Sequence, residues 1–286
     1  MKTIVIANHK GGCAKTTTAI NLSIVLASQG SRVLTVDLDP QGNLSVALGT
    51  DLQELESTRC TSHRMMLDAR GDVSAYLTRA RPRLDLVPSC LDHDAETLIE
   101  GQPVSRDLLL KNKLASVKSG YDYCVIDTPP SLRAPTLNAL AMSDMTIIPI
   151  ESSMFALVGL TQLMRMVAAV RRAHAPKMII MGLSTMYVAR QTVDREVRAQ
   201  MEAVFKTNIF ETRVPRAAAV NAATGSGKSV FETDIASPAA LAFFNLANEI
   251  RERFDHEKIG IDALASEHDE SIGAAEAETE NSRHKR

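Results

Sequence analysis

Residues 2–17 have the sequence KTIVIANHKGGCAKTT, and this stretch decides the fold. Residues 2–8 form a short β-branched run, which predicts a buried strand, and residues 16–28 carry apolar side chains at helical spacing. A glycine-containing turn joins the two. Backbone N–H groups at a helix N-terminus point toward a bound anion, and glycines let the main chain approach it closely. Strand, turn and helix in this order therefore predict a phosphate-binding loop.

The side chains of this loop suit a nucleotide phosphate. Lys15 would reach the β- and γ-phosphates, and the Thr16 hydroxyl would coordinate Mg²⁺. The common pattern G-x-x-x-x-G-K-[ST] is not met, because His9 and Ala14 occupy its two glycine positions, and K-G-G-x-x-K-T-T remains. The expected nucleotide-binding residues of the loop are Lys10, Gly11, Gly12, Cys13, Ala14, Lys15, Thr16 and Thr17.

The rest of the chain alternates between strand and helix patterns. Further strands are predicted over residues 32–37, 84–88, 123–127, 145–150 and 178–185. Helices are predicted over residues 104–117, 135–142, 156–173, 193–205 and 238–254. This alternation predicts an α/β fold with three layers, in which a mainly parallel twisted sheet has helices on both faces. The pattern is weakest over residues 51–83.

Carboxylates follow two of the predicted strands. The second strand ends in DLDPQGN, which places Asp37 and Asp39 at its carboxyl end, where open α/β sheets bind ligands. A turn-capping role for Asp37 and a direct role at a nucleotide are both open. Four apolar or aromatic residues precede Asp127, the Walker B arrangement, in which the carboxylate holds Mg²⁺ directly or through water.

The charge of the chain is unevenly distributed. The net charge is −2, yet residues 163–228 contain eleven Lys and Arg against four Asp and Glu. Charge of this density can hold nucleic-acid phosphates without recognising bases. Residues 255–286 have a net charge of −5 and few large apolar groups, so we expect a folded P-loop domain over residues 1–254 and an acidic, disordered tail over 255–286.

The composition argues against several classes of protein. The chain is 45% hydrophobic but only 4% aromatic, which disfavours an all-β sandwich. Its four cysteines form no C-x-x-C pair and no apolar signal segment follows the first Met, so a reducing cytoplasm is expected. No uncharged apolar run approaches the roughly 20 residues of a membrane helix.

The loop motif resembles the deviant Walker A motif of the ParA/MinD family of ATPases, in which an extra lysine, here Lys10, opens the loop. DLDPQGN resembles the switch segment of ParA proteins, and residues 127–132, DTPPSL, resemble the second switch. The resemblance covers roughly residues 2–254. It implies that Lys10 reaches across a nucleotide-sandwich dimer, and that Asp39 orients the hydrolytic water. It gives Lys10, Lys15 and Asp39 as catalytic residues.

The resemblance also implies contacts for the base and for DNA. Residues 214–216, VPR, correspond to a family segment near the adenine, which implicates Pro215, and residues 185–190 resemble the family segment TMxxAR, whose arginine is Arg190. A second family arginine is replaced by Ala219. With the other basic residues of this stretch, the expected DNA-binding set is Arg190, Arg165, Arg171, Arg172, Arg198, Lys206, Arg213 and Arg216.

The function implied by the resemblance is that of a short ParA-type ATPase without an N-terminal helix-turn-helix domain, for which operator-specific repression is not expected. ATP and Mg²⁺ would drive a homodimer that binds non-specific DNA. A ParB-like partner or cargo adaptor would stimulate its weak hydrolysis and so partition a plasmid or chromosome. The expected location is the cytoplasm, at the nucleoid, without membrane binding.

Three alternatives remain open. The same ATPase could position a protein cargo such as a carboxysome or a chemoreceptor cluster. A MinD-like membrane positioner would need a basic amphipathic helix at its end, and the tail is acidic. A metabolic P-loop ligase that forms amides would show turnover that depends on a small molecule.

Overall fold

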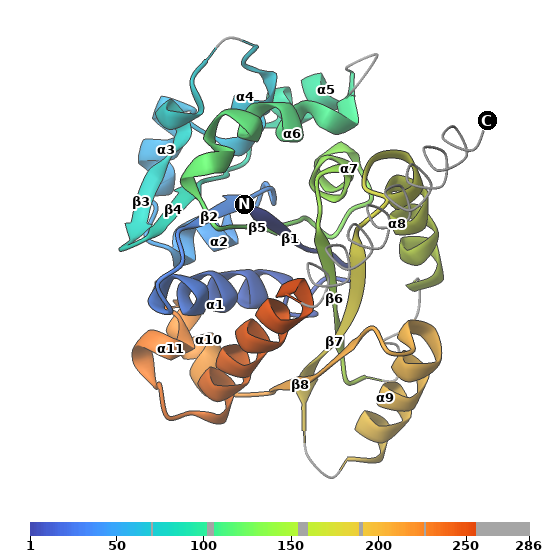
Figure 1. Ribbon diagram of the computed structural model, residues 1–286. Coiled ribbons are helices and arrows are strands. Elements are labelled where there is room, and N and C mark those ends of the chain that lie inside the picture. The colour runs from blue at the N-terminus through green and yellow to red at the C-terminus, as the bar shows by residue number, and fades with distance from the viewer. Residues whose placement is uncertain (70, 102–105, 154–159, 189–190, 226, 256–286) are drawn as a thin grey trace, which may run out of the picture. The chain divides into compact units, whose positions relative to one another are not determined.

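The computed structural model of this chain describes residues 1–69, 71–101, 106–153, 160–188, 191–225 and 227–255 (Figure 1). Residues Met1–Leu246 form one compact unit, which contains the sheet and the site below. Residues 238–255 are helical. The tail predicted over residues 255–286 lies outside the described residues except for Asp255, so its disorder and the 1–254 domain boundary stay predictions.

The sheet has eight strands in the described residues, in the order β3-β4-β2-β5-β1-β6-β7-β8. All neighbouring strands are parallel except β3, which runs antiparallel to β4. The strands are β1 (Lys2–Ile6), β2 (Val33–Asp37), β3 (Thr78–Arg81), β4 (Leu84–Val87), β5 (Tyr123–Asp127), β6 (Met145–Glu151), β7 (Ile179–Tyr187) and β8 (Ile209–Pro215). The predicted mainly parallel α/β sheet is confirmed.

Helices cover both faces of the sheet, because successive strand residues point to opposite faces and both sets are apolar. Val5, Ile126 and Ile148 belong to one core cluster. Helices that contribute to this cluster are α4 (Ser62–Leu67), α5 (His93–Glu100), α6 (Leu109–Leu114), α7 (Ala134–Ala141), α8 (Leu160–His174) and α9 (Thr192–Phe205). The opposite face packs on α1 (Lys15–Ser28), which contacts β1, β2, β4 and β5.

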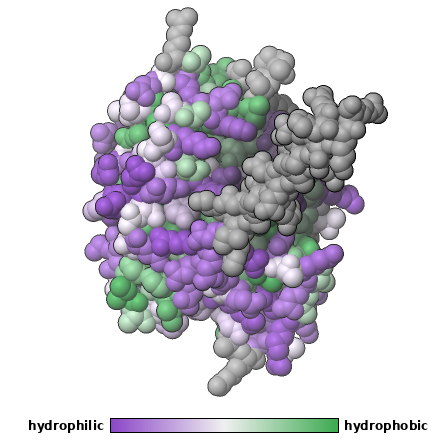
Figure 2. Space-filling model, viewed as in Figure 1, coloured by the Kyte–Doolittle hydropathy of each residue, from purple (hydrophilic) through white to green (hydrophobic). Residues whose placement is uncertain are grey.

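Shorter helices complete the unit. They are α2 (Asn43–Ala47), α3 (Leu52–Thr58), α10 (Ala218–Gly225) and α11 (Val230–Thr233), with 3₁₀ segments η1 (Val73–Tyr76), η2 (Arg106–Leu108) and η3 (Ala115–Gly120). The face of the molecule shown in Figure 2 is mainly hydrophilic, with separate hydrophobic patches. No helix of the described residues is both long enough and apolar enough to cross a bilayer.

The six predicted strands are all present, but two edge strands were missed. β8 exposes Glu211 and Arg213, and β3 has the sequence TRAR, so neither shows the continuous apolar run of a buried parallel strand. The single helix predicted over residues 104–117 is wrong: η2, α6 and η3 divide this stretch. Asn138 explains where α6 begins, because its side-chain oxygen accepts the backbone N–H of Leu110 at 3.0 Å.

Gly182 is required in the middle of β7 by close packing against α9. A Cβ added at Gly182 would lie 2.8 Å from the ring of Phe205, which is shorter than a carbon–carbon contact allows. We expect Gly182→Ala to lower the free energy of unfolding by about 1–3 kcal/mol, because overpacking forces strain into the core. Urea denaturation measures the change.

Gly120→Ala is the matched control. A Cβ at Gly120 would meet nothing within 4 Å, so this variant should unfold like the wild type. Phe205→Leu in the Gly182→Ala background should recover part of the loss, because the two sites are coupled through one contact. Equal stability of the two glycine variants would show that β7 and α9 are packed more loosely than the structure indicates.

Candidate functional site

The candidate site lies where the carboxyl ends of β2, β5, β1 and β6 meet, in the middle of the sheet (Figure 1). The parallel register places Asp37 at the end of β2 opposite Asp127 at the end of β5. Asp127 is also opposite Ile6, the last residue of β1 before the glycine-rich loop. The sheet therefore brings the loop and both predicted carboxylate segments together.

The loop leaves its backbone donors free. From Gly11 to Thr17, no backbone N–H donates a hydrogen bond within the described part of the chain. Gly12 has φ 75° and Ala14, at the N-cap of α1, has φ 69°. A left-handed conformation is costly for a residue with a Cβ, and glycine usually occupies such positions. Ala14 nevertheless adopts the left-handed conformation here. A row of unpaired N–H groups at a helix N-terminus is an anion site.

The loop is closed on itself through one carbonyl oxygen. The backbone oxygen of Lys10 accepts hydrogen bonds from Lys15 Nζ at 3.1 Å and from Cys13 Sγ at 3.2 Å. Burial raises the pKa of the Cys13 thiol, although the Lys15 charge lowers it. Thr185 Oγ1 at the end of β7 donates to the oxygen of Cys13 at 3.1 Å. The hydrogen bond to the Lys10 oxygen thus holds the buried ammonium of Lys15 beside the free N–H groups. A bound phosphate could take the place of that oxygen as the acceptor.

Lys10 is paired with an acidic residue that the sequence analysis did not identify. Its ammonium forms an ion pair with Glu151 at the end of β6 and donates to Ser153 Oγ at 3.1 Å. Partial burial raises the pKa of Glu151, but the bonds from Lys10 and Ser153 and the nearby charge of Arg216 outweigh it, so this pKa lies below its ordinary value. Glu151 could have been found by the rule that pointed to Asp37, since it also ends a parallel strand.

Asp127 is the least satisfied group of the site. It is fully buried, and neither carboxylate oxygen has a hydrogen-bond partner among the described residues. Burial, with the charge of Asp37 next, raises its pKa well above the ordinary value, and the nearby Thr16 hydroxyl and Lys15 lower it. Thr16 lies close, but its geometry falls short of a hydrogen bond. A buried, unpaired carboxylate beside a hydroxyl fits a divalent cation that binds oxygen.

Asp37 anchors the turn that carries Asp39. Its carboxylate accepts the Asp39 N–H at 3.0 Å, and the N–H and hydroxyl of Ser45 at 2.9 and 2.7 Å. Burial raises the pKa of Asp37 to about 7 although these bonds lower it. Asp39 Oδ1 accepts the Gln41 N–H at 3.0 Å. These bonds support the turn-capping alternative for Asp37, and they fix Asp39 at the edge of the site.

The predicted basic residues have different environments. Arg165, Arg171 and Arg172 on α8, Lys206 after α9, and Arg213 and Arg216 at β8 are all exposed. Arg213 lies over the Tyr187 ring, 5.3 Å from its centroid. Arg190 lies outside the described residues. Pro215 ends β8, so its place is consistent with the carboxyl edge of the sheet.

Arg198 is a correction to the predicted DNA-binding set. Its side chain is 9% exposed, and its guanidinium bonds to the Phe210 oxygen at 2.9 Å and to Glu202 at 2.8 Å. A buried guanidinium with these partners joins α9 to β8 and is not available to a phosphate at the surface. The structure therefore gives Arg198 a packing role, which a count of charges could not separate from binding.

Within the described residues no group of three or more His, Cys, Asp or Glu side chains is placed to hold a metal by itself. Mg²⁺ is commonly bound by one or two carboxylates together with substrate phosphates. The arrangement at Asp127 and Thr16 therefore fits Mg²⁺ that arrives with a nucleotide.

Replacing Asp127 should stabilise the nucleotide-free protein. A carboxyl whose pKa is raised by folding binds its proton more tightly when folded, so stability falls as the pH rises above the unfolded pKa of about 3.9. We expect Asp127→Asn to raise the free energy of unfolding at pH 8 by about 1–3 kcal/mol, because it removes a buried charge without a partner. The gain should shrink at pH 5. Urea denaturation in EDTA at both values measures it.

Asp122→Asn is the control, because it should change the free energy of unfolding at pH 8 in the opposite direction. Bonds from the backbone and side chain of Arg32 hold the pKa of the exposed Asp122 below its ordinary value, so this carboxylate stabilises the fold above its unfolded pKa. Its removal should lower stability at pH 8. If Asp127→Asn also destabilised the protein at pH 8, Asp127 would have a partner in the nucleotide-free state.

Three comparisons place the chain among known proteins. Residues 1–180 match AAA_31, a family described as an AAA domain. The chain is 36% identical over 256 residues to the chromosome partitioning protein ParA of Caulobacter vibrioides, covering 88% of this chain and 95% of that protein. It is 35% identical over 250 residues to the sporulation initiation inhibitor protein Soj of Bacillus subtilis, covering 87% of this chain and 98% of that protein.

A solved structure shares the fold over most of the chain. Cobyrinic acid a,c-diamide synthase from Mycobacterium smegmatis, crystallised with an ATP analogue and magnesium, is 30% identical with a TM-score of 0.77, covering 89% of this chain and 96% of that one. The match of the family model and the identity to ParA over nearly its full length agree with the loop and the sheet described above. The chain therefore belongs to the ParA family of P-loop ATPases.

Proposed function

We propose that this protein is a positioning ATPase that dimerises when it binds ATP, holds non-specific DNA in that state and releases it after hydrolysis. One observation carries the proposal: the unpaired N–H groups from Gly11 to Thr17 lie beside the unpaired carboxylate of Asp127. The first feature suits phosphate and the second suits a cation. A magnesium nucleotide would satisfy both at once.

Each residue of the site then has a role. Lys15 would exchange the Lys10 oxygen for the β- and γ-phosphates. Thr16 and Asp127 would hold Mg²⁺, which would neutralise charge on the phosphate oxygens. Asp39, fixed by its own turn, would orient the attacking water. Pro215 would lie near the adenine.

The dimer would couple nucleotide to DNA. Lys10 would leave Glu151 and reach the phosphates in a second subunit, so that two nucleotides lie between two copies of the chain. The exposed basic residues Arg165, Arg171, Arg172, Lys206 and Arg213 would then be present twice on one particle. Doubling a weak, salt-sensitive phosphate contact raises avidity without any new contact.

A partner would set the timing. We propose that a ParB-like protein or cargo adaptor stimulates hydrolysis locally, so that the cargo follows bound ATPase over the nucleoid in the cytoplasm. The name of the ParA relative supports a chromosome as cargo. The name of the diamide synthase supports a rival, an amide-forming ligase, for which turnover would need a small carboxylate substrate.

The central test is binding to non-specific duplex DNA, measured by gel shift with ATP, ADP or no nucleotide at two salt concentrations. We expect binding only with ATP, and loss of binding in Lys10→Ala because that variant cannot complete the dimer. Affinity should fall by about a hundredfold or more between 50 and 200 mM salt if several phosphates are contacted.

Asp39→Ala is the matched variant, since it should slow hydrolysis and prolong the DNA complex. DNA binding that is equal in all nucleotide states, or that survives Lys10→Ala, would contradict the proposal. No DNA binding together with ATP turnover that requires a small carboxylate would favour the ligase.

In the proposed dimer, Glu151 of the same chain competes with the phosphates in the second subunit for the ammonium of Lys10. We expect Glu151→Gln to form the ATP dimer at a roughly two- to fivefold lower ATP concentration, because a partly exposed ion pair contributes up to about 1 kcal/mol. Analytical ultracentrifugation in the Asp39→Ala background measures the dimer.

Ser153→Ala is the control, because it removes the hydroxyl that contacts Lys10 and keeps the charge of Glu151. It should change the ATP concentration at which half of the protein is dimeric less than Glu151→Gln does. A higher ATP requirement in Glu151→Gln would show that Glu151 supports the dimer directly.

A further inference from the structure

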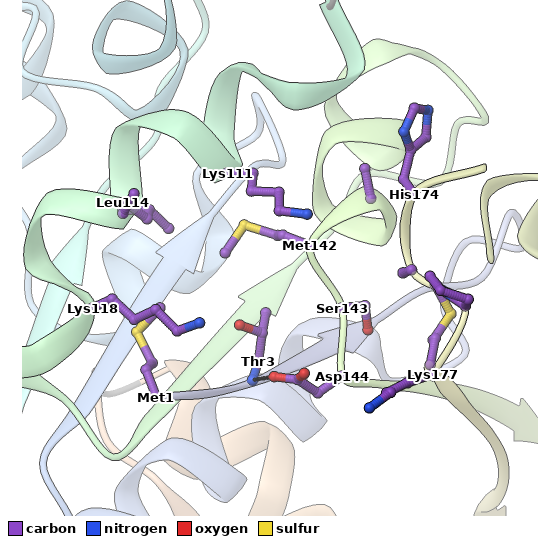
Figure 3. Close-up of a pocket in the computed structure, with 15 residues that line it drawn as sticks. Met1, Thr3, Lys111, Leu114, Lys118, Met142, Ser143, Asp144, His174 and Lys177 are labelled. Atoms are coloured by element: carbon purple, nitrogen blue, oxygen red, sulfur yellow. Dashed lines mark hydrogen bonds between the residues drawn. The ribbon is translucent and has the colours of Figure 1, made fainter. Parts of the chain in front are cut away.

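A pocket of about 370 Å³ lies at the amino-terminal edge of the sheet, away from the glycine-rich loop (Figure 3). Thr3 of β1, Asp144 before β6 and Met178 before β7 all line it, so it spans the starts of three strands. The other ends of these strands belong to the site described above. Its volume lies within the range of about 300–1,000 Å³ that is typical of small-molecule pockets.

The floor of this pocket is apolar. Met1, Met142 and Ala175 line it and are partly exposed, whereas Leu114 and Met178, which also border it, are at most 1% exposed. Figure 3 shows Leu114 and Met142 beside the space that the lysines surround. Thioether and aliphatic groups of this kind fit an aromatic or aliphatic body of variable shape.

The rim of the pocket is cationic. Lys111, Lys118 and Lys177 come from three separate stretches, α6, η3 and the turn after α8, and Figure 3 shows two of them on one side and Lys177 on the other. In the described part of the chain none of these ammonium groups has an ion pair or hydrogen bond. Asp144 is the one acidic residue of the described lining, and its carboxylate already accepts the Thr3 N–H at 2.7 Å.

We infer that this pocket binds a small organic anion with an apolar body, of the class of an aryl or alkyl phosphate. An anionic head would receive charge-assisted contacts from lysines of the rim, and the body would cover the partly exposed apolar side chains. The inference does not rest on the proposed function, because the pocket shares no lining residue with the nucleotide site.

A purely structural explanation exists for these lysines. Lys111 and Lys118 lie in the last turns of their helical segments, and Lys177 follows the end of α8, where cations complement the helix dipole. That explanation predicts lower stability when the lysines are neutralised and no ligand. The inferred site predicts a ligand and an apolar contribution to its affinity.

The probe for the test is 1-naphthyl phosphate, whose fluorescence is easily followed because the chain contains no Trp. The titration uses the full chain with saturating ADP and Mg²⁺, which keeps the proposed nucleotide site filled. We expect saturable binding that inorganic phosphate displaces poorly. Lys111→Gln, Lys118→Gln and Lys177→Gln combined should weaken it by at least about tenfold, because several charge-assisted contacts are lost.

The matched control combines Arg59→Gln, Arg195→Gln and Lys228→Gln, three exposed positions away from the pocket lining with the same change of charge. It should bind the probe within about twofold of the wild type, as expected for surface changes outside a site. Circular dichroism of both triple variants checks that they fold.

Three results of this titration would overturn the inference. These are no saturable binding in the presence of ADP, equal weakening in both triple variants, and displacement by inorganic phosphate at similar concentration. Vesicles of phosphatidylglycerol should leave the probe bound, since the pocket would take a soluble molecule. Displacement by the vesicles would assign the lysines to a membrane surface instead.

Discussion

The buried carboxylate of Asp127 is the constraint on which the site depends. The parallel register of β2 and β5 places Asp37 directly beside it, so two carboxylates share one buried edge of the sheet. The two carboxylates differ in their hydrogen-bond partners. Asp37 is saturated by Ser45 and the Asp39 N–H and so fixes a turn, while Asp127 has no partner and keeps a raised pKa. An unpaired buried charge is costly, so a cation at this point lowers the free energy of the whole edge.

The centre of the fold could be predicted from sequence because its physical requirements are local. A parallel strand buried on both faces must be apolar, and the polar groups of the site must follow its carboxyl end. These two rules identified β1, β2 and β5 together with the loops that follow them. The edges could not be predicted in this way. Among the described residues β3 and β8 each pair with a single strand and are partly exposed, so their sequences mix charged and apolar residues.

The site shows the same division. Lys15, Thr16 and Asp127 were predictable because spacing along the chain places them. Glu151 contacts Lys10 across 141 residues of sequence, and only the sheet order β1-β6 brings the two together. This pairing means that the Lys10 ammonium is already bound within a single chain, so in the dimer proposed above a second subunit would have to displace Glu151. Such a competition would make dimer formation depend on the charge that a nucleotide adds.

Charge counts along the chain have a similar limit. The excess of basic residues over 163–228 is a fact of sequence, yet Arg198 uses its charge to join α9 to β8, and Arg216 lowers the pKa of Glu151 at the nucleotide edge. Arg165, Arg171 and Arg172 keep exposed side chains along α8. Non-specific phosphate binding requires cations that are accessible to solvent and no recognition of bases, and these three side chains are accessible. The candidate DNA surface proposed above is therefore smaller than the charged segment, and the proposed dimer would present it twice.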